Sequence, residues 1–250
     1  TGSGAGSEMW AFVAPEHFSA LRRQRENDPE VRFPSTPSAN VTARPREYFF
    51  DGPIGAFQNT TAGEVAIFTG MRRGGRAVYA FNVNNPDLPR LMWTLNPTKS
   101  GYGALGQTWS MPRVTRVKGR IDPVLIMGGG YDNAAEDTVP AGTTTRGRGV
   151  YIANMRTGER LGWLPTEYSV PADVTLIDSD GDGFVDRAYV ADVRAQLYRV
   201  DMEDAAGTPR EPHAWVITKI AALNDSSTGM DGSRKVFFAP DAVITRNYTA

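Results

Sequence analysis

The chain has 250 residues, which is long enough to bury the core of one all-β domain or one large α/β domain. Its 27 Lys and Arg residues balance 28 Asp and Glu residues, so no net charge attracts nucleic acid or an anionic membrane. Cysteine is absent, which excludes disulfide bonds and thiolate metal sites.

Glycine and proline separate the apolar parts of the chain into short runs. The 26 Gly and 17 Pro residues therefore favour many strands and turns over long helices. No run approaches the ~20 apolar residues of a membrane span. The first residues, Thr1 to Gly4, carry neither an initiator methionine nor a signal sequence, so we expect an interior or processed fragment.

The N-terminal part of the chain predicts a strand, a helix and a long loop. Residues 7–13 alternate as a short strand does. Residues 15–27 predict a helix, because Pro15 suits a first turn, Phe18 and Leu21 lie three residues apart, and the second half is basic. Residues 28–46 are rich in proline, serine and threonine and predict a loop.

A weak internal repeat organises the rest of the chain. An apolar and aromatic strand recurs at residues 9–13, 78–83, 150–154 and 197–201, and the last three copies lie between an apolar strand and a strand that carries tryptophan. Units of four strands with uneven insertions are typical of propeller blades. The predicted strands are residues 48–52, 64–69, 78–83 and 90–95, then 108–117, 123–127, 150–154 and 160–164, then 173–177, 185–190, 197–201 and 213–220.

Both ends of the chain interrupt this repeat. Residues 7–13 predict the third strand of a blade whose first two strands are missing, and residues 235–245 predict the opening of another blade. We therefore expect an all-β fold, a modified β-propeller of three full and two partial blades, with one short helix near the N-terminus. Residues 1–250 would form this single, truncated domain.

The most specific stretch of the sequence is the aspartate loop, residues 178–186, with the sequence DSDGDGFVD. Four like charges so close together repel one another unless a cation holds them. Oxygen donors without Cys or His indicate a hard ion, with Ca²⁺ the first choice. The predicted ligands are the carboxylates of Asp178, Asp180, Asp182 and Asp186 and the backbone carbonyl of Phe184.

The aspartate loop departs from an EF-hand in two ways. An EF-hand places a bidentate Glu at position 12, where this chain has Tyr189, so Asp186 would have to close the coordination shell. The flanking residues 173–177 and 187–191 favour strands and lack a helical apolar period. The prediction is a calcium loop between two strands, and the alternative is a solvated Asp-Gly turn.

Five further motifs, read together, carry a resemblance. The chain resembles the C-terminal domain of PilY-type proteins, which are type IV pilus biogenesis factors and pilus-tip adhesins. The motifs are EYFFDGP (residues 47–53), GGRAVYAFNV (74–83), LGQTWSMP (105–112), MGGGYDN (127–133) and, after the aspartate loop, AYVADVRAQLYRVD (188–201).

The resemblance implies a modified seven-bladed β-propeller with a calcium loop that corresponds to Asp178, Asp180, Asp182, the Phe184 carbonyl and Asp186. It implies a role at the pilus tip in pilus assembly, in extension versus retraction, in surface adhesion and in twitching motility. The implied partners are minor pilins of the tip complex and host or abiotic surfaces. The implied location is the bacterial cell surface, reached through the periplasm and outer membrane. This chain ends after about four blades and contains no Arg-Gly-Asp tripeptide.

Two other classes of propeller stay open as alternatives. Residues 156–163 are similar to the repeat of pyrroloquinoline-quinone dehydrogenases, but an enzyme of that class often has a vicinal Cys pair, and Cys is absent. Integrin-like propellers carry the same aspartate pattern blade after blade, whereas it occurs once here. We expect no enzyme activity and assign no catalytic or cofactor-binding residue.

Overall fold

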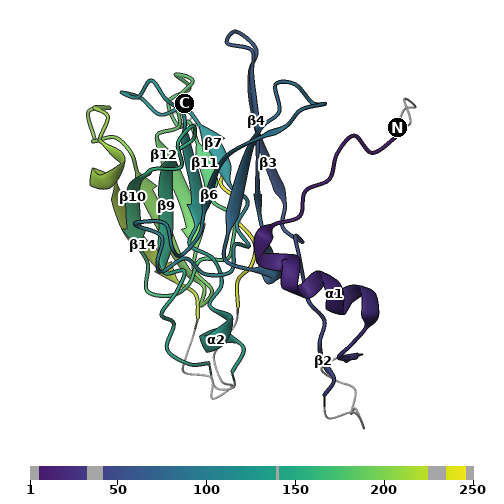
Figure 1. Ribbon diagram of the computed structural model, residues 1–250. Helices are drawn as coiled ribbons and strands as arrows, with labels where there is room; N and C mark the ends of the chain where they lie inside the picture. The colour runs from purple at the N-terminus through teal and green to yellow at the C-terminus, as the bar shows by residue number, and fades with distance from the viewer. Residues whose placement is uncertain (1–5, 33–41, 139–140, 225–234, 246–250) are drawn as a thin grey trace.

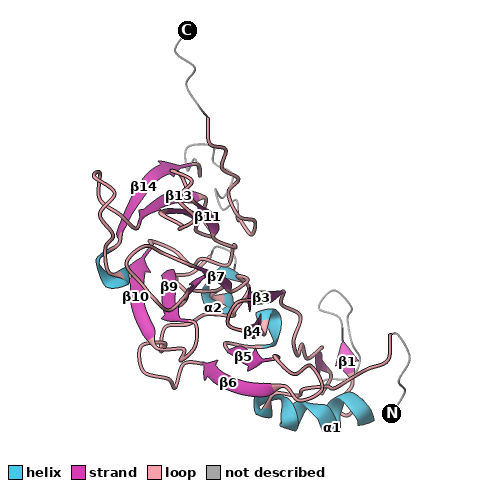
Figure 2. Ribbon diagram, turned by 90° about the horizontal axis from the view of Figure 1, so that it is seen from above, coloured by secondary structure: helices cyan, strands magenta, loops and turns pink. Residues whose placement is uncertain are grey.

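The computed structural model describes residues 6–32, 42–138, 141–224 and 235–245. In these residues the chain forms three antiparallel sheets, each a meander of four consecutive strands. Figure 2 shows the sheets fanned in chain order, with their first strands (β3, β7 and β11) on one side and their last strands (β6, β10 and β14) on the other. This is the blade arrangement of a propeller, so the predicted fold class is confirmed.

The strands follow the predicted repeat closely in the second and third positions of each blade. The first blade contains β3 (Ile54–Asn59), β4 (Glu64–Gly70), β5 (Val78–Asn82) and β6 (Arg90–Leu95). The second contains β7 (Arg113–Thr115), β8 (Val124–Gly128), β9 (Gly149–Asn154) and β10 (Arg160–Pro165). The third contains β11 (Thr175–Ile177), β12 (Arg187–Ala191), β13 (Gln196–Asp201) and β14 (Val216–Ala222).

The first blade opens later than predicted. Residues 48–52 form no strand, and β3 begins at Ile54, after Pro53, which has no N–H to donate to a ladder. The apolar side chains of the predicted strand pack instead: the Phe50 ring lies 5.7 Å from the Tyr79 ring. The prediction for residues 48–52 is therefore wrong because their apolar pattern serves packing on the face of the blade.

The N-terminal segment also packs without pairing. Residues 7–13 form no strand, and the Phe12 ring lies 5.1 Å from Tyr79 and 4.9 Å from Phe81. Together with Ala14 and Phe50 it covers the outer face of the first blade. The predicted partial blade is therefore absent from these residues, and its aromatic side chains occupy the face where a neighbouring blade would lie.

The predicted helix is confirmed in the N-terminal segment. A 3₁₀ turn, η1 (Pro15–His17), leads into α1 (Phe18–Glu26), which ends at Asn27 in the left-handed conformation. Figure 1 shows α1 beside the first blade. The remaining short elements lie in the connections, and none of the described helices has the length and apolar character needed to cross a membrane. These elements are β1 (Val31–Arg32), β2 (Arg44–Pro45), η2 (Arg72–Gly74), α2 (Asn133–Glu136) and η3 (Pro212–Ala214).

The C-terminal segment does not open a further blade. Residues 235–245 form no strand. The Val236 N–H donates to the Val193 carbonyl at 3.0 Å, and the Phe237 ring stacks on Trp109 at 5.4 Å. The prediction of a strand here is wrong: Val236 and Phe237 contact the second and third blades without joining a sheet, while Phe238 is largely exposed.

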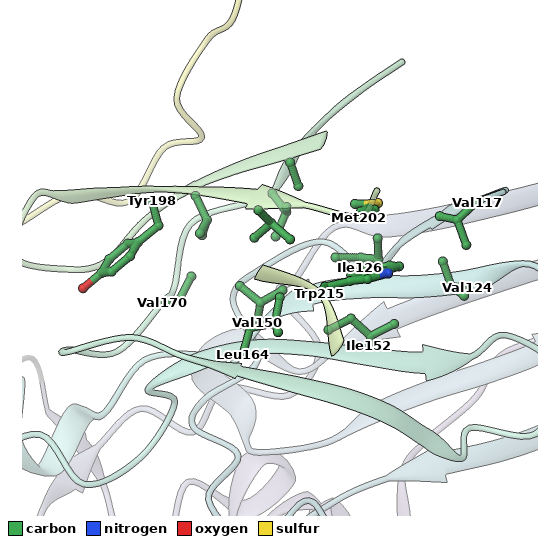
Figure 3. Packing of buried hydrophobic residues seen from close by; sticks show 14 residues of the cluster. Val117, Val124, Ile126, Val150, Ile152, Leu164, Val170, Tyr198, Met202 and Trp215 are labelled. Carbon is green, nitrogen blue, oxygen red and sulfur yellow. The ribbon is translucent and has the colours of Figure 1, made fainter. Parts of the chain in front are cut away.

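Side chains that alternate along the middle strands point to opposite faces of a blade. They form two hydrophobic cores, one at each junction between neighbouring blades. In β8, Val124 and Ile126 join the cluster shared with the third blade, while Leu125 and Met127 join the cluster shared with the first. Figure 3 shows Ile126 and Ile152 of the second blade among the side chains of the first of these clusters. A strand buried on both faces needs apolar side chains at every position, which explains the unbroken apolar run of β8.

We predict that Ile126→Ala destabilises the chain by about 2–5 kcal/mol, because Ile126 is 1% exposed and the substitution leaves a cavity between two blades. Ile121→Ala is the matched control, since Ile121 is 99% exposed in the connection between β7 and β8 and should change stability by no more than about 0.5 kcal/mol. Urea unfolding of both variants measures the difference. Equal losses would contradict the proposed packing.

Candidate metal centre

The aspartate loop joins the first two strands of the third blade. Ile177 at the end of β11 pairs with Arg187 at the start of β12, and the Asp186 N–H donates to the Ile177 carbonyl at 3.1 Å. The loop is thus the connection of an antiparallel strand pair, as its strand-forming flanks predict. It has no helix on either side, so the ligands are positioned by the register of two strands.

Three of the four aspartates converge. Asp178, Asp180 and Asp182 each offer a carboxylate oxygen, and these oxygens lie within 4.8 Å of one another. Backbone N–H groups fix them: Gly183 and Gly181 donate to Asp178 at 2.8 Å and 2.7 Å. The backbone of the loop therefore wraps around its own carboxylates and donates hydrogen bonds to them.

The two glycines of the loop are required by backbone conformation. Gly181 has φ +79° and Gly183 has φ +91°, a region that residues with a Cβ rarely adopt. A Cβ at either position would have open space around it, so crowding is not the reason for glycine. The turns made by these glycines direct the N–H groups inward.

Two of the three converging carboxylates, those of Asp178 and Asp182, are held in their charged form. The N–H groups of Gly183 and Gly181 hold the pKa of Asp178 below its usual range. The ammonium of Lys118 and the N–H of Phe184 do the same for the pKa of Asp182. Ionised carboxylates at this spacing repel one another, and the arrangement suits an added cation.

Asp186 is placed differently from the other three aspartates. Its carboxylate is buried, with 8% of the residue exposed, and accepts hydrogen bonds from the Ser179 hydroxyl at 2.6 Å and the Ser179 N–H at 3.2 Å. The Phe184 N–H donates to Asp182 at 2.9 Å, and no described residue donates to the Phe184 carbonyl. The roles of Asp186 and Phe184 as ligands stay predictions.

Two residues beside the loop were not predicted from the sequence. Lys118, in the connection between β7 and β8, places its Nζ 2.8 Å from Asp182 and 3.9 Å from Asp180. The same Nζ lies 3.2 Å from the carboxylate of Glu203, which follows β13. These ion pairs raise the pKa of Lys118. Aligning the blades would have placed this connection beside the aspartate loop, because both follow the first strand of a blade, but no local signal marks Lys118 itself.

The all-oxygen donor set fits a hard divalent cation. Carboxylates and a backbone carbonyl are the ligands that Ca²⁺ prefers, and the Lys118 ammonium shows that this group of oxygens already attracts positive charge. An open cleft of about 480 Å³ adjoins the loop, lined by acidic and basic side chains that include Asp201 and Arg199. Arg199 pairs with Asp201 at 3.0 Å, so this part of the cleft is neutralised internally.

The comparisons with known proteins agree with the fold and the motifs. No family model matches the chain. It is 26% identical over 165 residues to a type IV pilus biogenesis factor PilY1 homolog of Xylella fastidiosa, a match that covers 64% of this chain and 12% of the relative. It is 28% identical over 210 residues to PilY1 of Pseudomonas aeruginosa strain PAO1, which covers 79% of this chain and 15% of the relative.

The fold has a counterpart among solved structures. The crystal structure of the Pseudomonas aeruginosa PilY1 C-terminal domain matches with a TM-score of 0.66 and 19% identity, over 96% of this chain and 46% of that one. The match shows the shared fold, and the relatives share sequence over more than half of the chain. Together they confirm the resemblance to the C-terminal domain of PilY-type proteins. The chain spans only 12% to 15% of the length of these curated relatives.

We predict that Asp186→Ala destabilises the chain by about 1–3 kcal/mol even in excess chelator, because it leaves the partly buried hydrogen-bond donors of Ser179 without their charged acceptor. Asp87→Ala is the control: Asp87 is exposed in the connection between β5 and β6, and its loss should cost no more than about 0.5 kcal/mol. Urea unfolding with chelator measures both variants. Equal stability of the two would show that Asp186 does not hold the loop closed.

Proposed function

We propose that this chain is the calcium-binding propeller part of a type IV pilus biogenesis factor. The observation that carries the calcium assignment is the convergence of Asp178, Asp180 and Asp182, whose carboxylate oxygens lie within 4.8 Å of one another. The pilus assignment is supported by relatives named as type IV pilus biogenesis factors. Those relatives are not named as enzymes, and we propose no catalytic role for this chain.

The proposed mechanism follows from where the loop lies. Bound Ca²⁺ would neutralise the carboxylates and fix the connection between β11 and β12, which lies at the rim of the third blade against the second. Without Ca²⁺ the like charges favour a more open loop. Occupancy would in this way set the shape of one rim of the propeller.

We propose that this rim acts at the pilus tip on the bacterial surface. There it would contact minor pilins or the surface to which the bacterium attaches, and calcium occupancy would bias the pilus between extension and retraction. Adhesion and twitching motility would follow from that bias. Secretion through the periplasm and outer membrane is part of the same proposal.

The calcium site is tested with a double variant, Asp180→Asn with Asp182→Asn. Calorimetric titration with calcium chloride should show binding to the unaltered chain and at least about tenfold weaker binding to the variant, because two of the converging charged ligands are lost. Asp204→Asn is the control, since Asp204 is an exposed aspartate that accepts backbone N–H groups, as Asp178 does, but lies outside the converging group. Equal affinity of all three proteins would refute the site.

The pilus role is tested in the bacterium that encodes the chain. Deleting the gene should reduce surface pili and the width of the twitching zone, and the full-length gene should restore both. A full-length gene with Asp180→Asn and Asp182→Asn should restore protein level but not the response of the twitching zone to calcium. A deletion strain with normal pili and motility would overturn the pilus assignment.

A further inference from the structure

A lysine from the second blade contacts the aspartate loop of the third. Lys118 Nζ lies 2.8 Å from Asp182 Oδ2, 3.9 Å from Asp180 Oδ2 and 3.2 Å from the carboxylate of Glu203. Its side chain is about one-third exposed, so water and ions reach it. Two of the three converging aspartates therefore already share one positive charge.

The connection that carries Lys118 is fixed to its surroundings on both sides. The Arg116 carbonyl accepts the Val185 N–H at 3.0 Å, which ties the connection to the aspartate loop itself. The Arg120 guanidinium pairs with Glu211 at 2.8 Å, which ties it to the residues before β14. These two contacts hold the chain on both sides of Lys118. The fold therefore places the Lys118 side chain against the carboxylates.

The ammonium lies on the oxygens that a metal ion would use. Backbone N–H groups occupy both oxygens of Asp178 and the Oδ1 atoms of Asp180 and Asp182. The Oδ2 atoms of Asp180 and Asp182 face Lys118 instead. A Ca²⁺ ion takes carboxylate oxygens at about 2.3–2.6 Å, so an ion on these atoms would lie within a few ångströms of Nζ and be repelled by it.

We propose that Lys118 is an internal competitor of the divalent cation at the aspartate loop. Metal binding displaces the ammonium from Asp182, and Glu203 retains it. The lysine lowers the affinity of the loop for the cation, and the partner of its ammonium depends on occupancy. This inference rests on the proposed calcium site and adds to it a residue that sets affinity.

The first experiment is calorimetric titration of calcium chloride into four proteins: the unaltered chain, Lys118→Met, Lys118→Arg and Lys219→Met. Lys118→Met keeps the length of the side chain and removes its charge, so it should bind roughly tenfold more tightly. Lys118→Arg keeps the charge and should not tighten binding. Lys219, in β14, pairs with Glu167 at 2.5 Å. Lys219→Met therefore removes the same charge from a different ion pair and should leave the affinity for calcium unchanged.

The outcomes separate the two proposals. Calcium binding that is equal in the unaltered chain and Lys118→Met overturns the competition but leaves the calcium site standing. Weaker binding by Lys118→Met also overturns it, because the lysine would then support the loop. Absence of binding by every protein overturns the calcium site and the competition together.

The second experiment needs no variant. Acetic anhydride acetylates free lysine amines, and mass spectrometry gives the extent of acetylation at each lysine. If calcium displaces the ammonium from Asp182, acetylation of Lys118 should rise when calcium chloride is added, while that of Lys219 stays constant. Unchanged or reduced acetylation of Lys118 at a calcium concentration that saturates the calorimetric signal overturns the displacement.

Discussion

The structure depends on one constraint: the middle strands of the second blade, β8 and β9, are buried on both faces. The five residues of β8 are all buried, and alternate ones face the first blade and the third. Such a strand has no face for water, so the second blade needs a cover on each side. The second blade has a blade on each side, whereas the first uses Phe12 and Phe50 of its flanking segments on its outer face. Burial of the facing side chains therefore sets the position of each blade relative to its neighbour. The blades in turn position the connections between their strands.

The same constraint brings the charged residues of the rim together. Since neighbouring blades pack face to face, the connection after the first strand of one blade lies beside the matching connection of the next. Lys118 and Asp182 are 64 positions apart in the sequence, yet their charged atoms meet at 2.8 Å. A local change of charge at the aspartate loop thus acts at a junction between two blades. Regulation by an ion needs this kind of link between a binding loop and packed elements.

The features of the fold and of the loop that could be predicted from the sequence are those that local residue patterns determine. The spacing of Asp178, Asp180 and Asp182 around two glycines is a local pattern, and the structure brings those three carboxylates together. The third strands of the blades were predicted because an apolar and aromatic pattern with strand alternation recurs along the chain. Residues 48–52, 7–13 and 235–245 have similar apolar patterns but pack without pairing, and only tertiary contacts distinguish the two uses. Lys118 was missed for the same reason, since an isolated lysine has no local signature.

The contacts of Asp186 bear on how tightly the aspartate loop could hold the proposed ion. In the structure its carboxylate is bound to Ser179, within the same loop, and lies apart from the converging group. To serve as the closing ligand it would have to exchange those hydrogen bonds for the metal, just as Asp182 would have to exchange Lys118. Both exchanges replace one satisfied state of the loop with another, so the net gain on binding is smaller than the number of ligands suggests.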